Sequence, residues 1–140
     1  MRQELSPELM EQLYSPDAAA FWGDRAWALP LWEEAAGAIL SLGEGIEVRY
    51  AKTQVTFRTR NGFAFLSPPY RRRKGWPEEC ILLTFGLGYP VEHPRIAVKT
   101  EAAPGRWTHH VVLSEPGQVD EVVMGWLREA YEFSFRGRRG

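Results

Sequence analysis

The chain has 140 residues and a formal net charge of −1; hydrophobic residues make up 44% of it and aromatic residues 13%. This composition excludes a disordered chain, and the length fits one domain that buries roughly two thirds of its unfolded surface. A single cysteine, Cys80, excludes an internal disulfide and favours a reducing, cytoplasmic location. The N-terminus is charged and no segment approaches the roughly 18 apolar residues of a membrane span, so we expect a soluble protein without a signal peptide or a membrane partner.

Two helix start signals lie near the N-terminus. Ser6-Pro7-Glu8 and Ser15-Pro16-Asp17 each combine a hydroxyl cap, a proline at the first helical position and a carboxylate in the first turn. They predict short helices over residues 7–14 and 16–22. Four side chains are expected to cover one edge of the core: Leu9, Leu13, Phe21 and Trp22.

Two longer helices flank a series of strands. Residues 31–42 have apolar side chains at helical spacing, and so does a segment that begins near residues 114–117 and ends near Phe133. The second helix would bury Val119, Val122, Val123, Trp126, Leu127, Ala130 and Tyr131. Between the helices, stretches rich in β-branched and aromatic residues predict strands over residues 46–50, 53–60, 63–67, 81–87, 95–99 and 106–114.

This order predicts an α+β fold, in which an antiparallel sheet is packed by the helix of residues 31–42 and by a long C-terminal helix. A meander is the simplest order for the strands. We expect a helical extension over residues 1–26, one domain over residues 27–135 and a disordered basic tail over residues 136–140.

The register of the hairpin at Asn61-Gly62 decides which side chains share a face of the sheet. A two-residue loop would place Arg58 opposite Phe65 and so mix charge with core. A three-residue loop over residues 60–62, with Gly62 left-handed, pairs Phe57 with Phe65 and keeps the cations on the other face. We therefore prefer the three-residue loop.

The charge distribution is the strongest functional signal. No Asp or Glu occurs from residue 48 to residue 77, although this interval holds eight of the 17 basic residues. They are Arg49, Lys52, Arg58, Arg60, Arg71, Arg72, Arg73 and Lys74. Part of the surface should therefore be electropositive and attract an anionic partner, either a small molecule or nucleic acid.

Two parts of this interval could bind an anion. Lys52, beside Thr53 and Gln54, could hold a phosphate or carboxylate or act as a base, or it is a solvated lysine at a strand end. The run from Arg71 to Lys74, flanked by Tyr70 and Trp76, combines cations for phosphates with aromatic rings for stacking. Its alternative role is that of a solvated loop.

The histidines give no metal-site pattern. Side chains of adjacent residues in a strand point to opposite faces, so His109 and His110 cannot chelate one metal together, and one should be buried while the other is exposed. Neither Cys80 nor His93 has a partner at zinc-type spacing. No glycine-rich phosphate loop or nucleophile elbow is present, and we predict neither a metal nor a cofactor.

Several segments together resemble a family of small bacterial domains, domain of unknown function 5655. They are Leu31-Trp32-Glu33, Lys52-Thr53-Gln54-Val55-Thr56-Phe57 followed by Phe63-Ala64, Trp107-Thr108-His109-His110-Val111, and Asp120 with Trp126-Leu127-Arg128-Glu129-Ala130-Tyr131. The resemblance covers residues 27–133 and implies the same order of helix, sheet and helix. It implies no activity, and the stretch over residues 70–79 is longer and more basic than the family pattern.

The leading hypothesis is a module that binds an anionic ligand. Its candidate ligand-binding residues are Lys52, Gln54, Arg58, Arg71, Arg72, Arg73, Lys74 and His109. An enzyme that uses Lys52 and a histidine for proton transfer is the second class. A structural or partner-binding protein with exposed Trp22, Trp27 or Trp76 is the third.

Overall fold

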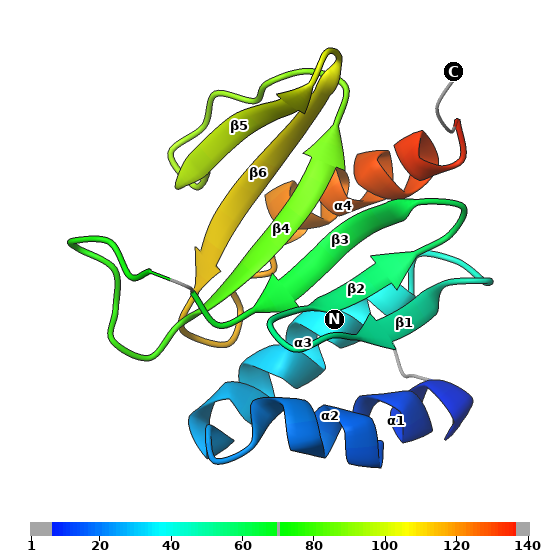
Figure 1. The fold of residues 1–140 in the computed structure, drawn as a ribbon, viewed down its shortest axis with the longest axis vertical. Coiled ribbons are helices and arrows are strands. Elements are labelled where there is room, and N and C mark those ends of the chain that lie inside the picture. The colour runs from blue at the N-terminus through cyan, green and yellow to red at the C-terminus, as the bar shows by residue number, and fades with distance from the viewer. Residues whose placement is uncertain (1–6, 70, 137–140) are drawn as a thin grey trace.

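The computed structural model describes residues 7–69 and 71–136. Within them the helices are α1 (Pro7–Leu13), α2 (Pro16–Trp22), the 3-10 helix η1 (Ala26–Ala28), α3 (Leu29–Leu40) and α4 (Glu121–Ser134). The strands are β1 (Glu47–Tyr50), β2 (Val55–Arg58), β3 (Gly62–Ser67), β4 (Ile81–Leu87), β5 (Val98–Ala103) and β6 (Arg106–Leu113). The predicted α+β class is confirmed (Figure 1).

Parts of the sequence-based interpretation fall outside the described residues. These parts are the Ser6 cap, the Tyr70 ring, the Leu9 side chain and the tail from residue 137 onward. The division into an extension over residues 1–26 and a domain over residues 27–135 stays a prediction.

The six strands of the described chain form one antiparallel sheet in the order β1-β2-β3-β4-β6-β5. The predicted meander is therefore wrong in its last part, because β4 pairs with β6 and not with β5. Most side chains of β4 are buried, whereas β5 is largely exposed and carries Lys99 and Glu101. Burial of apolar surface favours the apolar strand β6 beside β4 and leaves the polar strand at the edge of the sheet.

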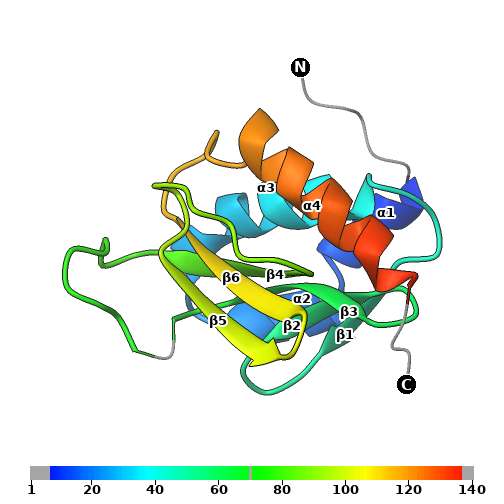
Figure 2. The same cartoon turned by 90° about the horizontal axis from the view of Figure 1, so that it is seen from above.

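Helices α3 and α4 lie on one side of this sheet, and no described helix covers the other side (Figure 2). The core lies between the helices and the sheet. Trp32 of α3 contacts the ring of Phe57, with 6.1 Å between the ring centroids. Trp126 of α4 stacks on Phe85 at 5.7 Å. Both helices therefore pack on the same side of the sheet through aromatic contacts.

The short N-terminal helices form where the sequence predicted them. The Ser15 hydroxyl accepts a hydrogen bond from the backbone N–H of Ala18 at 3.1 Å and so caps α2. Leu13 and Trp22 are buried, as expected, and the Trp32 indole donates to the Leu13 carbonyl at 2.8 Å. This bond joins α1 to α3, so the extension packs against the core.

Helix α4 begins with a cap that the apolar pattern alone does not reveal. The Asp120 carboxylate accepts a hydrogen bond from the N–H of Val123 at 3.1 Å, and it forms an ion pair with Arg95, also at 3.1 Å. The buried side chains of the helix include Val123, Trp126 and Leu127, as predicted. The helix begins later than the predicted start near residues 114–117, so Val119 precedes it and is only partly buried. Val122, also predicted to be buried, is 45% exposed.

The predicted register of the β2–β3 hairpin is wrong. Phe57 pairs with Ala64, and Thr56 pairs with Phe65, so Phe57 and Phe65 point to opposite faces of the sheet. The bulge lies within the strands, where Arg58 pairs with Gly62 and Phe63 is the extra residue. Phe63 can then pack on Tyr131 of α4, with 5.6 Å between centroids, while Ala64 also faces the helices. Gly62 does not have a positive φ.

Candidate functional site

The side of the sheet without helices is lined by polar and apolar side chains from four strands. Because successive residues alternate between faces, the pairing that turns Phe57 and Leu66 toward the helices turns Phe65 and Ser67 away from them. The same pairing brings other side chains to this face: Gln54, which precedes β2, Thr84, Val98, Thr108 and His110. The free face is therefore amphipathic, with hydroxyl, amide and imidazole groups around an aromatic ring.

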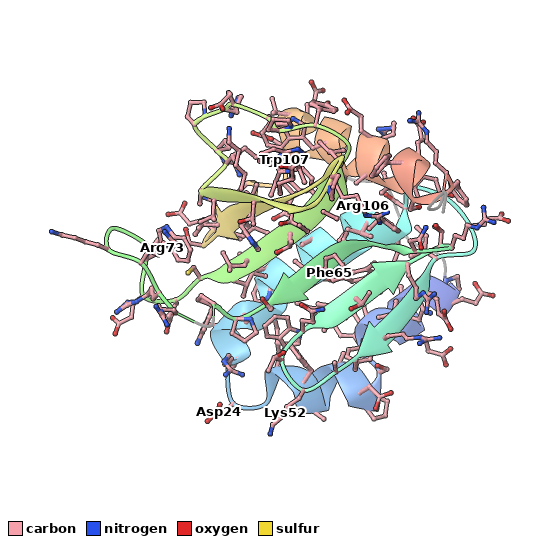
Figure 3. All side chains as sticks on the ribbon, turned by 45° about the horizontal axis from the view of Figure 1, so that its top comes forward. Asp24, Lys52, Phe65, Arg73, Arg106 and Trp107 are labelled. Atoms are coloured by element: carbon pink, nitrogen blue, oxygen red, sulfur yellow. The ribbon has the colours of Figure 1, made fainter. Side chains whose placement is uncertain are left out.

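Residues 68–80 connect β3 to β4 and border one end of this face. A cavity of about 500 Å³ lies between this connection and the sheet. We call it the sheet-face cavity; its lining residues are Gln54, Phe65, Ser67, Arg71, Arg73, Trp76, Leu82, Thr84, Val98, Thr108 and His110. Figure 3 shows Phe65 over the middle of the sheet and Arg73 on the connection beside it. Segments far apart in the sequence thus form one concave site.

The sheet-face cavity carries positive charge that its own lining does not neutralise. Arg71 and Arg73 are exposed, and none of the described lining residues is an Asp or Glu. The ion pairs among the described residues involve other cations, namely Arg49, Arg95 and Lys99. An anion that enters the cavity would therefore find guanidinium groups that are not held by a carboxylate there.

His110 is the titratable group beneath these arginines. Its Nδ1 atom lies 2.8 Å from the hydroxyl oxygen of Thr84, and the side chain is half-buried. Burial lowers the pKa of His110 below its usual range, and the positive charge of Arg73 lowers it further. The lowered pKa favours the neutral imidazole, which offers a polar, uncharged surface to a ligand.

His109 lies on the opposite side of the sheet, as the alternation of adjacent residues predicts. It is fully buried, stacks on Phe85 at 5.1 Å and accepts a hydrogen bond from the Val91 N–H through Nε2 at 3.0 Å. Burial lowers its pKa. The sequence-based hypothesis assigned ligand binding to His109, whereas the histidine in the cavity is His110. Nothing in the local sequence indicates which of the two histidines faces the helices.

The cavity brings together only part of the predicted ligand-binding set. Gln54, Arg71 and Arg73 are among its lining residues, but Arg72 and Lys74 are exposed on the same connection without lining it. Lys52 is exposed in the turn between β1 and β2 and does not line the cavity.

Arg58 of β2 also lies outside the cavity lining. Its Nη2 donates to the Arg60 carbonyl at 3.3 Å. Lys52 and Arg58 therefore do not join the two cavity arginines around one ligand. The eight predicted residues are thus divided between the cavity, its outer rim, the remaining surface and, for His109, the core under the helices.

Sequence reasoning identified Trp76 beside the basic run but missed Phe65, Thr84 and His110 as members of the same site. The wrong hairpin register placed Phe65 in the core, and the meander gave no reason to put β6 beside β4. Thr84 of β4 pairs with Phe65 of β3 and with His110 of β6, so the correct strand pairing would have placed all three side chains on one face of the sheet.

Two further features are absent from the described residues. No group of three or more His, Cys, Asp or Glu side chains in that part of the chain could hold a metal ion. None of the described helices has both the length and the apolar character needed to cross a membrane.

The chain belongs to the family described as domain of unknown function (DUF5655), which matches residues 18–134. This match confirms the resemblance seen in the sequence and spans the whole sheet-face cavity. No curated protein and no solved structure matches the chain. The family description names no activity, so any functional conclusion depends on the geometry of the site.

Proposed function

We propose that this protein binds a small anionic ligand in the sheet-face cavity. The observation that carries the proposal is the pair Arg71 and Arg73 at a cavity whose described lining residues include no acid. Guanidinium groups bind carboxylates and phosphates in a bidentate manner, and such charge-assisted hydrogen bonds are stronger than neutral ones. A cytoplasmic location, which the single buried thiol of Cys80 favours, is part of the same proposal.

The size and remaining chemistry of the cavity support a small ligand. Its volume of about 500 Å³ lies within the roughly 300 to 1,000 Å³ typical of small-molecule sites. Ser67, Thr84 and Gln54 offer hydroxyl and amide groups that can orient a bound anion. Phe65, Trp76, Leu82 and Val98 add the apolar and aromatic surface that such sites usually have.

The chain offers matched variants for the test, because cations that line the cavity alternate with cations that do not. Arg71→Gln/Arg73→Gln removes the two lining arginines, and Arg72→Gln/Lys74→Gln removes two neighbouring charges from the same exposed connection. Both variants change the net charge equally. A difference in binding between the two variants then depends on where the lost cations lie and not on how much charge is lost.

The measurement is thermal unfolding with phosphate, sulfate and citrate at constant ionic strength. A ligand at ten times its Kd stabilises the folded state by about 1.4 kcal/mol, or roughly 3 to 5 °C for a domain of this size. We expect this rise in wild type and in Arg72→Gln/Lys74→Gln, and its loss in Arg71→Gln/Arg73→Gln. An equal rise in all three proteins, or none in wild type, would contradict the proposal.

A nucleic-acid partner gives a different pattern. A polymer that follows the whole basic connection would use all four cations, so both double variants would weaken binding of a labelled single-stranded oligonucleotide alike. Its log K would fall against log salt with a slope of about −0.7 per phosphate contacted. That result would contradict a small ligand in the cavity and would favour a polyanion that binds along the basic connection.

The two other classes suggested by the sequence receive less support from the geometry. Lys52 is not a lining residue of the cavity that contains His110, and His109 faces the helices. Trp22 is buried, so it cannot contribute to a partner-binding aromatic patch. The proposed function is accordingly ligand binding, with Arg71 and Arg73 as the residues that recognise the charge.

A further inference from the structure

We propose that the anion bound in the sheet-face cavity also carries a planar aromatic or heteroaromatic ring, which lies against Phe65 and Trp76. This inference rests on the proposed function, because the charged end of the same ligand would meet Arg71 and Arg73. It adds the chemical class of the uncharged part. The ligand would resemble a mononucleotide or an aromatic carboxylate more than a bare phosphate or a sugar phosphate.

Phe65 supplies the first observation. It is a large aromatic residue on the face without helices, at a position that pairs with Thr56 on one side and Thr84 on the other. It is only half-buried, although the aromatic residues Phe57, Phe63 and Phe85 are all buried under the helices. The ring therefore has surface left to cover, and a ligand in the cavity can cover it.

The neighbouring glycine lets the Phe65 ring lie along the sheet. A Cβ atom built at Gly62 would lie 3.2 Å from the Phe65 ring and equally close to the Thr56 methyl group. The ring thus leans over the glycine backbone, where a larger side chain would push against it. A ring in this position offers part of its surface to the space above the sheet.

Trp76 supplies the second observation. It comes from the basic connection, is half-buried and lines the same cavity as Phe65, Leu82 and Val98. The cavity therefore has aromatic and aliphatic groups as well as two guanidinium groups at one site. Bases stack favourably on aromatic side chains, and guanidinium groups can also stack on rings. A flat anion uses both kinds of contact, and a ring-free anion uses only the charge.

The test compares two pairs of probes by isothermal titration calorimetry at low salt: adenosine 5′-monophosphate against ribose 5-phosphate, and phenyl phosphate against inorganic phosphate. Both members of each pair carry a phosphate group, and only the first carries an aromatic ring. We expect the ring to tighten binding at least about tenfold in one or both pairs. Trp76→Leu and Phe65→Leu should remove this advantage and leave the affinity for the ring-free member within about twofold. Circular dichroism and the melting temperature establish that each variant is folded.

The outcomes separate this inference from the proposed function. Equal affinities within both pairs overturn the aromatic ligand but leave the anion site in place, provided that Arg71→Gln/Arg73→Gln still abolishes binding. A ring advantage that persists in both Leu variants also overturns the inference, because the ring would then bind elsewhere. If none of the four probes binds to wild type, the proposed function fails together with the inference.

Discussion

The two phenylalanines of the β2–β3 hairpin provide a direct test of which face of the sheet is free. Phe57 is fully buried and contacts Trp32, whereas Phe65 lies half-buried on the face without helices. Truncation to alanine removes the same atoms from both positions. Only the surroundings of the two side chains differ, so the difference in stability reports the packing.

The expected magnitudes follow from burial. Phe57→Ala should lower the free energy of unfolding by about 3 to 5 kcal/mol, because it opens a cavity between the sheet and α3. Complete burial of a phenylalanine contributes about 1.5 to 3 kcal/mol, so Phe65→Ala, which loses about half of that and leaves no enclosed cavity, should cost about 1 kcal/mol. The melting temperature should fall by roughly 3 °C for Phe65→Ala and by 10 °C or more for Phe57→Ala.

Urea denaturation followed by tryptophan fluorescence, with circular dichroism as a second probe, measures both variants. Both probes should give the same midpoint, as two-state unfolding requires. Equal losses at the two positions, or a larger loss for Phe65→Ala, would refute the assignment of faces. Phe65 would then not line the sheet-face cavity.

Three further predictions concern α4 and the histidines. Trp126→Ala should lower the free energy of unfolding by about 3 to 5 kcal/mol. Val122→Ala, at a position that is 45% exposed, should change it by no more than about 0.5 kcal/mol. Similar denaturation midpoints for the two variants would show that Trp126 is not a core residue. Asp120→Ala should cost about 1 to 2 kcal/mol in urea denaturation and Asp120→Asn clearly less, since the amide oxygen can still cap Val123; equal losses would argue against the cap. Because burial lowers the pKa values of His109 and His110 from the usual 6.5, the unfolded chain binds more protons below that pH, and stability should fall as the pH drops from about 7 to 5.5. His109→Gln should make the dependence of stability on pH shallower, and an unchanged dependence would show that His109 does not contribute to it.

The elements that the sequence predicts best are those in which one local signal decides the outcome. Helix α4 shows an uninterrupted apolar face, and Ser15-Pro16 marks the start of α2, so neither depends on distant residues. The strand order depends on which apolar strands compete for the centre of the sheet. The long connection over residues 88–97 permits β6 to take the place beside β4, and nothing local specifies that exchange.

The candidate site was predicted only in part for a similar reason. The run of cations identified Arg71 and Arg73, because charge patterning is visible in the sequence itself. The assignment of His110 rather than His109, and of Phe65 rather than Phe57, depends on strand register. A single bulge at Gly62–Phe63 reverses the faces of the residues beyond it, so an error at the hairpin carried over to the site.

The most direct measurement is an NMR titration of uniformly labelled protein with phosphate, and with chloride at the same ionic strength as the control. Binding in the sheet-face cavity should shift the indole N–H of Trp76, the imidazole of His110 and the amide of Phe65 along saturating curves that share one Kd. Chloride should leave these signals nearly unchanged. If phosphate produces no saturating shifts, or if the shifts gather around Arg49 and Lys52, the sheet-face cavity is not the anion site.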